Sequence, residues 1–272
     1  GEVVAPSLGF GTDFPGIDMT AADIDGDGSP EVGVLGVNPI SRQIRALFQN
    51  VDTPAVVSQL HQPAKFQPLQ LLTLPTVNGG SDAEAAVSVV NPADGQQGVR
   101  LVDTGTTAFL RNLEFGATYE TVTTAVIPDA GGPGVAGVAH LGVATDPDGI
   151  RVRMRNAASG EILTTSFIQN KRSAVDLAAV SSIGGNNKPE IATLIGSDNN
   201  KGRAVVFNGA TGARLGDFEM QSINSPVDLA VSADIDGNGA DELISLGTGN
   251  GVDRIGIYDA ATGTQLRRID VP

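Results

Sequence analysis

The sequence contains no cysteine and no tryptophan, and only two tyrosines and nine phenylalanines among its 272 residues. Without cysteine there are no disulfide bonds, no thiolate nucleophiles and no cysteine-ligated zinc. The scarcity of aromatic residues disfavours sugar sites that depend on exposed aromatic platforms. No apolar run reaches roughly 18 residues, which excludes a membrane-spanning helix. No basic-then-apolar leader stands at the N-terminus, and a chain that starts after signal removal would show none.

Positive charge is also scarce. The chain has 17 Lys and Arg against 31 Asp and Glu, for a net charge of −14. Phosphate backbones and anionic lipid surfaces repel such a chain, so nucleic acid and membrane insertion are poor predictions. Part of the acidity lies in two compact clusters, where it favours a bound cation instead. The 40% hydrophobic residues come in short bursts between Gly, Pro, Asp and Asn, which is typical of short strands and tight turns.

A repeat of about 52 residues organises the chain. Its first anchor is a strand-like segment that recurs around Asp18, Gln70, Thr124, Asp176 and Asp228. A second, apolar anchor follows in each copy, and a third consists of an alternating strand and a turn. The third anchor is clearest at Val152–Gly160, Val205–Gly212 and Ile255–Gly263. Asp or Asn followed by small residues and Gly suits a tight chain reversal.

Each copy then holds four short strands, the last of them after the turn. Four antiparallel strands per repeat of this length are typical of propeller blades, which must stack to bury both faces. We therefore predict an all-β, five-bladed β-propeller that occupies residues 14–272 as a single domain. Residues 1–13 are predicted to be an extra N-terminal strand or the remnant of an upstream blade, and these two alternatives stay open.

Two acidic loops stand at the same place in the first and fifth repeats. They run from Asp23 to Glu31 and from Asp234 to Glu242. Side-chain oxygens at positions 1, 3, 5 and 9 and a backbone carbonyl at position 7 can converge on one hard cation, while glycines let the loop curl. The predicted ligands of two Ca²⁺ sites are Asp23, Asp25, Asp27, Ser29, Glu31, Asp234, Asp236, Asn238, Ala240 and Glu242.

The alternatives to calcium are weaker. A solvated acidic turn explains one such loop, but two in the same register favour a metal. Mg²⁺ is the lesser candidate because it keeps more water and a stricter octahedron. An EF-hand needs Glu at position 12 and flanking helices, whereas these loops carry Glu at position 9 and are flanked by strands.

The loops resemble the D-x-D/N-x-D-G-x-x-D/E motif of FG-GAP or VCBS repeats in integrin-α-like β-propellers. The resemblance covers Phe14–Pro272, with the metal motif intact in blades one and five. It implies a calcium-dependent extracellular or cell-surface propeller used in adhesion, recognition or assembly. Two departures are that such propellers commonly have seven blades, and that position 9 here is Glu instead of the more usual Asp.

The corresponding segments of the middle repeats have lost most ligands. They are Thr76–Glu84, Pro128–Gly134 and Ser182–Glu190. In the last of them Asn186 and Glu190 remain as oxygen donors, which is too few for a tight site.

No catalytic motif is present, and we predict no enzyme. The two histidines, His61 and His140, stand outside any recognisable motif and are expected to be structural. Other carboxylates, such as Asp129, Asp146 and Asp148, lie in turn-like sequence, which disfavours a glycosidase or polysaccharide lyase. Alternation on one strand places Ile150, Val152 and Met154 opposite Arg151, Arg153 and Arg155, and that arginine stripe is predicted to be an outward face more than an anion site.

The function expected from the sequence is therefore calcium-stabilised binding, adhesion or surface assembly without catalysis. A protein partner or self-assembly is the expected mode. The alternative is a calcium-dependent lectin, since calcium can bridge to a sugar directly and glycan is a possible partner.

Overall fold

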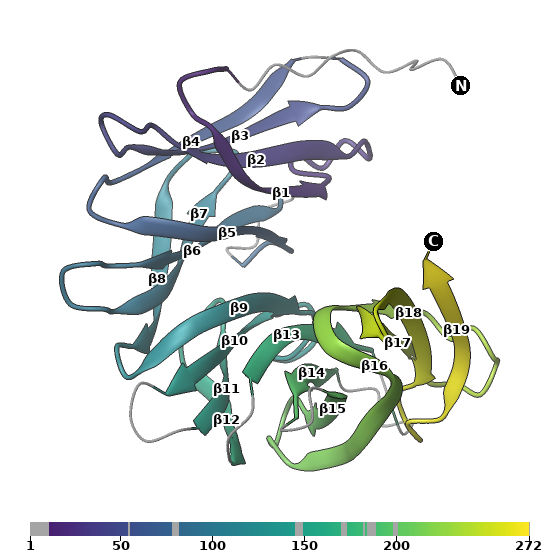
Figure 1. Ribbon diagram of the computed structural model, residues 1–272. Helices are drawn as coiled ribbons and strands as arrows, with labels where there is room; N and C mark the ends of the chain where they lie inside the picture. The colour runs from purple at the N-terminus through teal and green to yellow at the C-terminus, as the bar shows by residue number, and fades with distance from the viewer. Residues whose placement is uncertain are drawn as a thin grey trace. The chain divides into compact units, whose positions relative to one another are not determined.

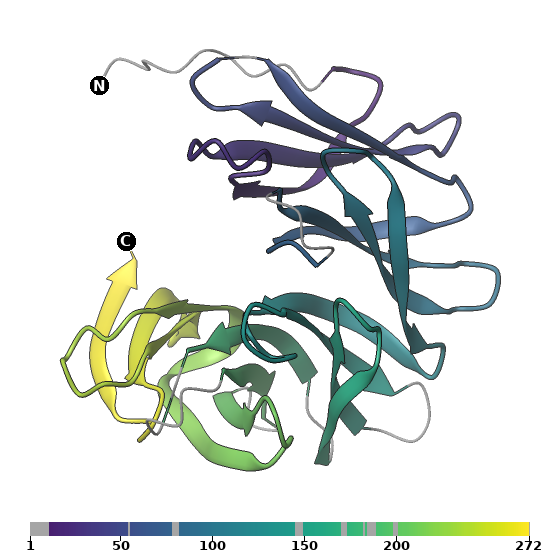
Figure 2. The ribbon, with the colours of Figure 1, turned by 180° about the vertical axis from the view of Figure 1, so that it is seen from behind.

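The computed structural model describes residues 11–53, 55–77, 82–144, 149–169, 173–181, 183, 189–197 and 201–271. Every regular element in these residues is a β-strand, β1 to β19 (Figure 1, and from behind in Figure 2). The predicted all-β class is confirmed. Among the same residues no helix could cross a membrane. Most of the predicted N-terminal strand, residues 1–10, lies outside the described part.

Three sheets have four antiparallel strands each, and each sheet corresponds to one predicted repeat. Their strands lie side by side in chain order, as a simple meander. The first comprises β1 (Gly16–Ala22), β2 (Glu31–Val37), β3 (Ile44–Asn50) and β4 (Val56–Gln62). The second comprises β5 (Gln67–Leu74), β6 (Glu84–Val90), β7 (Gln97–Asp103) and β8 (Phe109–Gly116). The third comprises β9 (Tyr119–Ile127), β10 (Gly137–Ala144), β11 (Gly149–Asn156) and β12 (Ile162–Gln169).

The fourth sheet differs from the prediction because it has seven strands. They are β13 (Ser173–Val180), β14 (Glu190–Gly196), β15 (Lys201–Asn208), β16 (Arg214–Ser232), β17 (Glu242–Gly249), β18 (Val252–Asp259) and β19 (Gln265–Val271). The first half of β16 pairs with β15, and its second half pairs with β17. The fourth and fifth repeats thus share one strand.

The shared strand β16 is interrupted between its two halves. Its pairing with β17 shifts register on both sides of Pro226, and Ser225 before it has a φ of 44°. Proline cannot donate to a β-ladder, so the ladder breaks here. Four strands lie on each side of this break when each half of β16 is counted once.

The predicted turns after the third strand of each repeat are present. Gly160, Gly212 and Gly263 all have a positive φ, between 69° and 79°. In the last two turns the glycine N–H donates to the carbonyl oxygen of Asn208 or Asp259, at 2.8 and 2.9 Å. Only glycine adopts this backbone conformation without steric cost, which explains its recurrence.

By compactness the chain divides into two units. One comprises Gly1–Ala117 and Ala157–Gly160, and the other comprises Thr118–Asn156 and Glu161–Pro272. The prediction of a single domain over residues 14–272 stays a prediction.

Each unit buries an apolar core between consecutive sheets. In the first unit, Leu35 and Phe48 of the first sheet share a cluster with Leu71 and Val87 of the second. In the second unit one cluster joins the third and fourth repeats, and another, which includes Leu243 and Tyr258, joins the fourth and fifth. The sheets therefore stack face to face through their inward-pointing side chains, as a blade repeat requires.

Candidate metal centres

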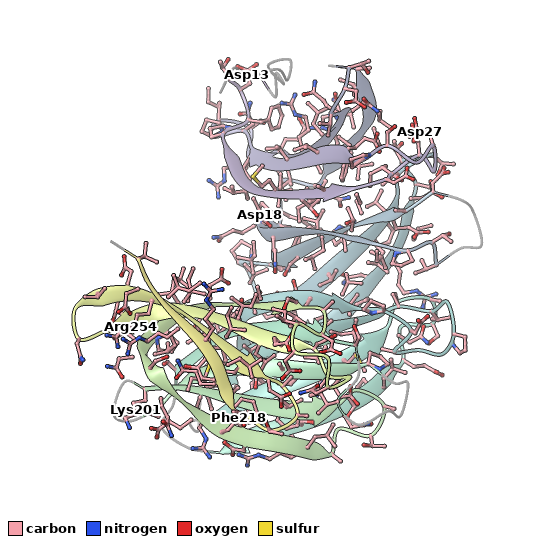
Figure 3. The ribbon with its side chains drawn as sticks, turned by 90° about the vertical axis from the view of Figure 1, so that its right-hand side faces the viewer. Asp13, Asp18, Asp27, Lys201, Phe218 and Arg254 are labelled. Carbon is pink, nitrogen blue, oxygen red and sulfur yellow. The ribbon has the colours of Figure 1, made fainter. Side chains whose placement is uncertain are left out.

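The two acidic loops occupy equivalent connections. Loop one (Asp23–Glu31) joins β1 to β2, and loop five (Asp234–Glu242) joins β16 to β17. In Figure 3 Asp27 lies on loop one, out beyond the strands of its sheet. Both loops lie between the first two strands of a repeat, so the predicted placement is confirmed.

Loop one is wound around the carboxylate of Asp23. The N–H groups of Gly26 and Gly28 donate to its two oxygens, at 2.8 and 2.9 Å. Asp25 accepts the N–H of Asp27 at 3.2 Å. One carboxylate oxygen from each of Asp23, Asp25 and Asp27 lies within 4.8 Å of the other two. The loop thus brings three of its predicted ligands together.

Loop five has the same winding around Asp234. The N–H groups of Gly239 and Gly237 donate to its oxygens at 2.9 and 2.6 Å, and these bonds lower the pKa of Asp234. Gly237 and Gly239 have φ values of 81° and 90°, which favour glycine. Here the three carboxylates that lie within 4.8 Å of one another are Asp234, Asp236 and Glu242.

The glutamate at position 9 has a second task that the sequence reading missed. It is at most 1% exposed wherever it occurs, and its carboxylate accepts the N–H of the residue seven positions earlier. The four donor and acceptor pairs are Ile24 with Glu31, Val77 with Glu84, Ile183 with Glu190, and Ile235 with Glu242. Two of these glutamates stand in repeats without the aspartates. The glutamate is therefore a loop-closing residue of the fold.

In loop one both carboxylate oxygens of the glutamate accept hydrogen bonds from the protein. Oε2 of Glu31 accepts the N–H of Ile24 at 2.8 Å, and Oε1 accepts the side-chain amide of Asn50 at 3.1 Å. Burial raises the pKa of Glu31. In loop five, by contrast, Oε1 of Glu242 is buried and has no hydrogen-bond partner among the described residues.

Position 7 is predicted to supply a backbone carbonyl in each loop. The N–H of Ser29 donates to Asp27 at 2.7 Å, and that of Ala240 donates to Asn238 at 2.7 Å. These matching bonds hold position 7 against position 5 in both loops. Coordination by the two carbonyl oxygens stays a prediction.

The donor sets fit a hard divalent cation. Three carboxylates that approach so closely repel one another unless a cation lies between them. None of the ion pairs found among the described residues involves Asp23, Asp25 or Asp27 of loop one, nor the carboxylates of loop five. Oxygen donors alone favour calcium or magnesium over zinc.

A buried aspartate beside loop five was not predicted. Asp259 ends β18, is 2% exposed, and pairs in register with Glu242. Although its burial raises the pKa, hydrogen bonds from Thr262 and Asn238 lower it overall. In the sequence Asp259 has the pattern of a turn residue. Its proximity to loop five follows from the register of β17 and β18.

The degenerate loops show no comparable set of carboxylates in the part of the chain that the structure describes. In the third repeat Asp129 accepts the N–H of Gly134 at 2.6 Å, as a plain turn. In the fourth repeat Asn186 lies outside the described residues, as do Asp146 and Asp148 farther upstream.

The histidines have the surroundings of structural residues. His140 is 1% exposed and its Nε2 lies 2.9 Å from the hydroxyl of Thr121. Burial, with Arg151 and Arg153 nearby, lowers its pKa to about 3, so the ring is neutral near pH 7. His61 is exposed and contacts the Gln59 amide.

The arginine stripe lies on β11 as predicted. Ile150, Val152 and Met154 belong to the core, and the arginines point to the opposite face of the sheet. That face is not outward as predicted, because Arg151 is 3% exposed and Arg153 and Arg155 are half-buried. Arg151 stacks on the ring of Tyr119, 3.8 Å from its centre. Such a contact stabilises the arginine within the sheet. Anion binding by this stripe stays a prediction.

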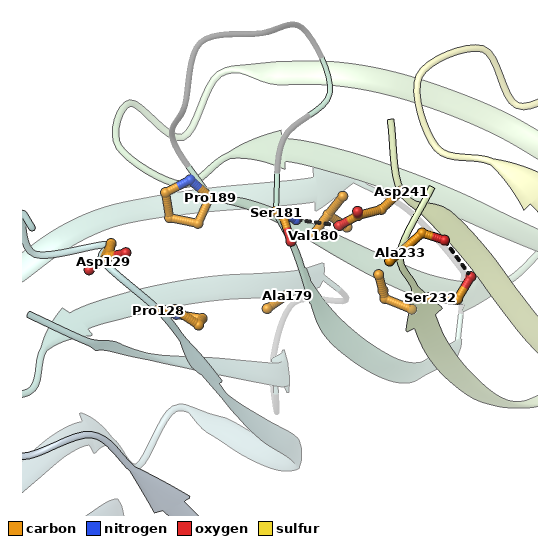
Figure 4. Close-up of a pocket in the computed structure, with 10 residues that line it drawn as sticks. Pro128, Asp129, Ala179, Val180, Ser181, Pro189, Ser232, Ala233 and Asp241 are labelled. Atoms are coloured by element: carbon orange, nitrogen blue, oxygen red, sulfur yellow. Dashed lines mark hydrogen bonds between the residues drawn. The ribbon is translucent and has the colours of Figure 1, made fainter. Parts of the chain in front are cut away.

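A cavity of about 470 Å³ opens next to loop five (Figure 4). Ser232 and Ala233, which precede the loop, and Asp241 within it line one side. Ser181 and Asp129 also line the cavity. The N–H of Ser181 donates to the carboxylate of Asp241 at 2.6 Å. The lining combines carboxylates and hydroxyls with small apolar side chains.

Sequence comparison finds no relative. No protein-family model matches the chain, and no curated protein sequence does. The likeness is structural only.

Solved structures match over nearly the whole chain. The "Dos1 propeller" matches with a TM-score of 0.58 and 12% identity, over 93% of this chain and 59% of that one. BBS1N, from a crystal of its complex with ARL6DN soaked with lead, matches with a TM-score of 0.56 and 11% identity, over 93% and 80%. Kuenenia stuttgartiensis hydrazine synthase matches with a TM-score of 0.57 and 13% identity, over 96% and 67%. At these identities the likeness shows the fold, and the fold is that of a β-propeller.

Proposed function

We propose that this protein is a calcium-stabilised binding or assembly module of the extracellular space or the cell surface, without catalytic activity. The observation that carries the proposal is the recurrence of one carboxylate loop at equivalent positions of the first and fifth repeats. Each loop brings three carboxylate oxygens within 4.8 Å of one another. Extracellular calcium is abundant enough to fill such exposed loops, whose affinities are commonly modest.

We assign the chain to the FG-GAP or VCBS class of propellers on the same loops, in five blades. Calcium would be held by the aspartates of loop one and by Asp234, Asp236 and Glu242 of loop five. A bound cation removes the mutual repulsion of the carboxylates and so stiffens the connection between two strands. A stiff loop edge presents a fixed surface to a partner.

A protein partner or self-assembly is the proposed mode of action. Propellers use their loop faces as platforms, and the similar chain BBS1N was crystallised in complex with ARL6DN. The net charge of −14 argues against nucleic acid and anionic membranes as alternatives.

Calcium-dependent glycan binding is the second candidate, and the cavity beside loop five favours it. Asp129, Ser181 and Asp241 supply carboxylates and polar groups that suit sugar hydroxyls. A glycan array read with calcium and with EDTA tests it. Binding that requires calcium and is lost in Asp241→Ala supports the lectin, and an array without binding rejects it.

The experiment for the main proposal is native mass spectrometry with calcium, combined with light scattering after gel filtration. The wild type should carry two calcium ions, and Asp25→Asn and Asp236→Asn should each carry one. A chain without calcium at millimolar concentration would overturn the proposal. Oligomers that require calcium would make assembly the function, and a stable monomer would make partner binding the function.

A further inference from the structure

Asp259 lies beneath loop five although it belongs to a different turn. It is the last residue of β18, and the N–H of Ala260 after it donates to the carbonyl of Asp241 in loop five, at 3.1 Å. Its register partner across the strand pair is Glu242. Both side chains are buried, with Glu242 0% and Asp259 2% exposed. Two buried carboxylates on register partners are stabilised by a nearby positive charge.

The contacts of these two carboxylates point towards loop five. Oδ2 of Asp259 accepts the side-chain amide of Asn238, and the same amide donates to Asp236 at 3.2 Å. Oε2 of Glu242 accepts the N–H of Ile235, whereas its buried Oε1 has no hydrogen-bond partner among the described residues. An anionic oxygen without a donor is costly to bury. The Glu242 carboxylate also has an oxygen within 4.8 Å of oxygens of Asp234 and Asp236, so it is suited to a cation.

Loop one distributes the same charges differently. Asn50, the last residue of β3, stands where Asp259 stands in the fifth repeat, and its amide donates to Oε1 of Glu31. Position 5 of loop one is the exposed carboxylate Asp27, whereas position 5 of loop five is the amide Asn238. In both the first and the fifth repeat, position 5 of the loop and the last residue of the third strand are therefore one amide and one carboxylate. The two repeats have them in opposite order.

We infer that Asp259 supplies the fourth negative charge of the loop-five cation site, a charge that Asp27 supplies as a ligand in loop one. The inference rests on the proposed calcium sites. Asp259 acts through Asn238 and through the field at the buried face of the site, as a positioning residue. Calcium at loop five then ties the β16–β17 connection to the β18–β19 turn, whereas calcium at loop one is held within a single loop.

Closing its own turn does not require Asp259 to be charged. Oδ1 of Asp259 accepts the N–H of Thr262 at 2.5 Å, and Oδ1 of Asn208 accepts that of Thr211 at 2.9 Å in the same turn of the fourth repeat. Asparagine thus closes this turn elsewhere in the chain. Asp103 provides a matched control, because it closes the turn of the second repeat opposite Glu84 but has no acidic loop above it.

The test is calcium titration by isothermal calorimetry in the full chain, with loop one silenced by Asp25→Asn. In that background D259N should weaken calcium binding about 10-fold to 100-fold, the range for residues that orient metal ligands. D103N should leave the affinity unchanged. The double variant N238D/D259N reproduces the loop-one order and should recover most of the lost affinity. Melting in EDTA should show D259N and D103N folded.

The reciprocal change keeps the inference testable if D259N fails to fold. With loop five silenced by Asp236→Asn, D27N should weaken calcium binding and D27N/N50D should restore it. Affinity in D259N within twofold of its parent, or no recovery in either double variant, would overturn the inference while leaving the calcium sites intact. An absence of calcium binding in the wild type would instead overturn the proposed function.

Discussion

The first and fifth repeats, the proposed blades one and five, carry the same nine-residue motif, yet they surround it with different chemistry. In blade one position 5 of the loop is the exposed Asp27, and the amide of Asn50 donates a hydrogen bond to the buried Glu31. In blade five the loop carries Asn238, and the additional carboxylate is the buried Asp259. Charges interact more strongly where water is excluded. The comparison teaches that residues of a neighbouring turn set the charge and hydrogen bonding around a repeated motif.

The strongest challenge to this comparison is calcium removal. Each site that binds calcium at about 100 times its dissociation constant adds about 2.7 kcal/mol. A change of 1 kcal/mol shifts the melting temperature of a domain this large by about 2–4 °C. EDTA should therefore lower the melting temperature of the wild type by roughly 10 °C or more. Asp236→Asn should lose more of this difference than Asp25→Asn, as scanning calorimetry with and without calcium can show.

Replacing the position-9 glutamate separates folding from metal binding. Glu84→Ala leaves the part-buried N–H of Val77 without its acceptor, which costs about 2 kcal/mol. Urea unfolding should show the same loss with calcium and with EDTA, because blade two lacks the aspartates. The loss of unfolding free energy in Glu242→Ala should be larger in calcium than in EDTA. Equal losses for Glu242→Ala in both conditions would mean that this glutamate has only the structural task.

The first strands of the first and fourth repeats also differ, and the pH dependence of stability should reveal it. Burial and the neighbouring Asp228 raise the pKa of Asp176 to about 7, against 3.8 for an ordinary aspartate. In blade one Asp18 accepts the N–H of Leu71 at 2.7 Å, as Asp176 accepts the N–H of Leu229 at 3.1 Å. Gln70 stands in blade one at the position that corresponds to Asp228.

The folded chain therefore holds a proton that the unfolded chain releases above about pH 4. The stability that this proton contributes is complete below pH 4 and is lost as pH rises through 7. Asp176→Asn should flatten the melting temperature between pH 5 and pH 8 by a few degrees relative to the wild type. An unchanged slope in Asp176→Asn would contradict the raised pKa of Asp176.

The smallest predicted effect concerns the arginine on the third strand of each blade. Arg45 in blade one lies over the ring of Phe14, at 4.1 Å, whereas Arg254 in blade five pairs with Asp270 at 2.8 Å. Phe14→Leu and Asp270→Asn should each cost roughly 0.5–1 kcal/mol. In 1 M salt the cost of Asp270→Asn should vanish and that of Phe14→Leu should persist, as urea unfolding can measure. A salt-independent Asp270→Asn would show that the pair acts through packing.

Much of the fold was predictable because the repeat is local. Alternating apolar residues define strands such as β11, and Gly160, Gly212 and Gly263 mark turns that need a positive φ. The shared strand β16 was not predictable, since nothing in the residues around Pro226 states whether the ladder stops or bends there. The dual use of the position-9 glutamate was also missed, although its recurrence in repeats without aspartates was a usable signal.

The sequence by itself determined the repeat, the strands and the two acidic loops, because each depends on residues within a few positions of one another. Only the tertiary structure decided that Asp259 lies beneath loop five and that Asn50 takes its place in blade one. Strand register brings together residues about 20 positions apart and sets how deeply each carboxylate is buried. How strongly the charges interact depends on that burial, so the difference between the two loops is a property of the fold.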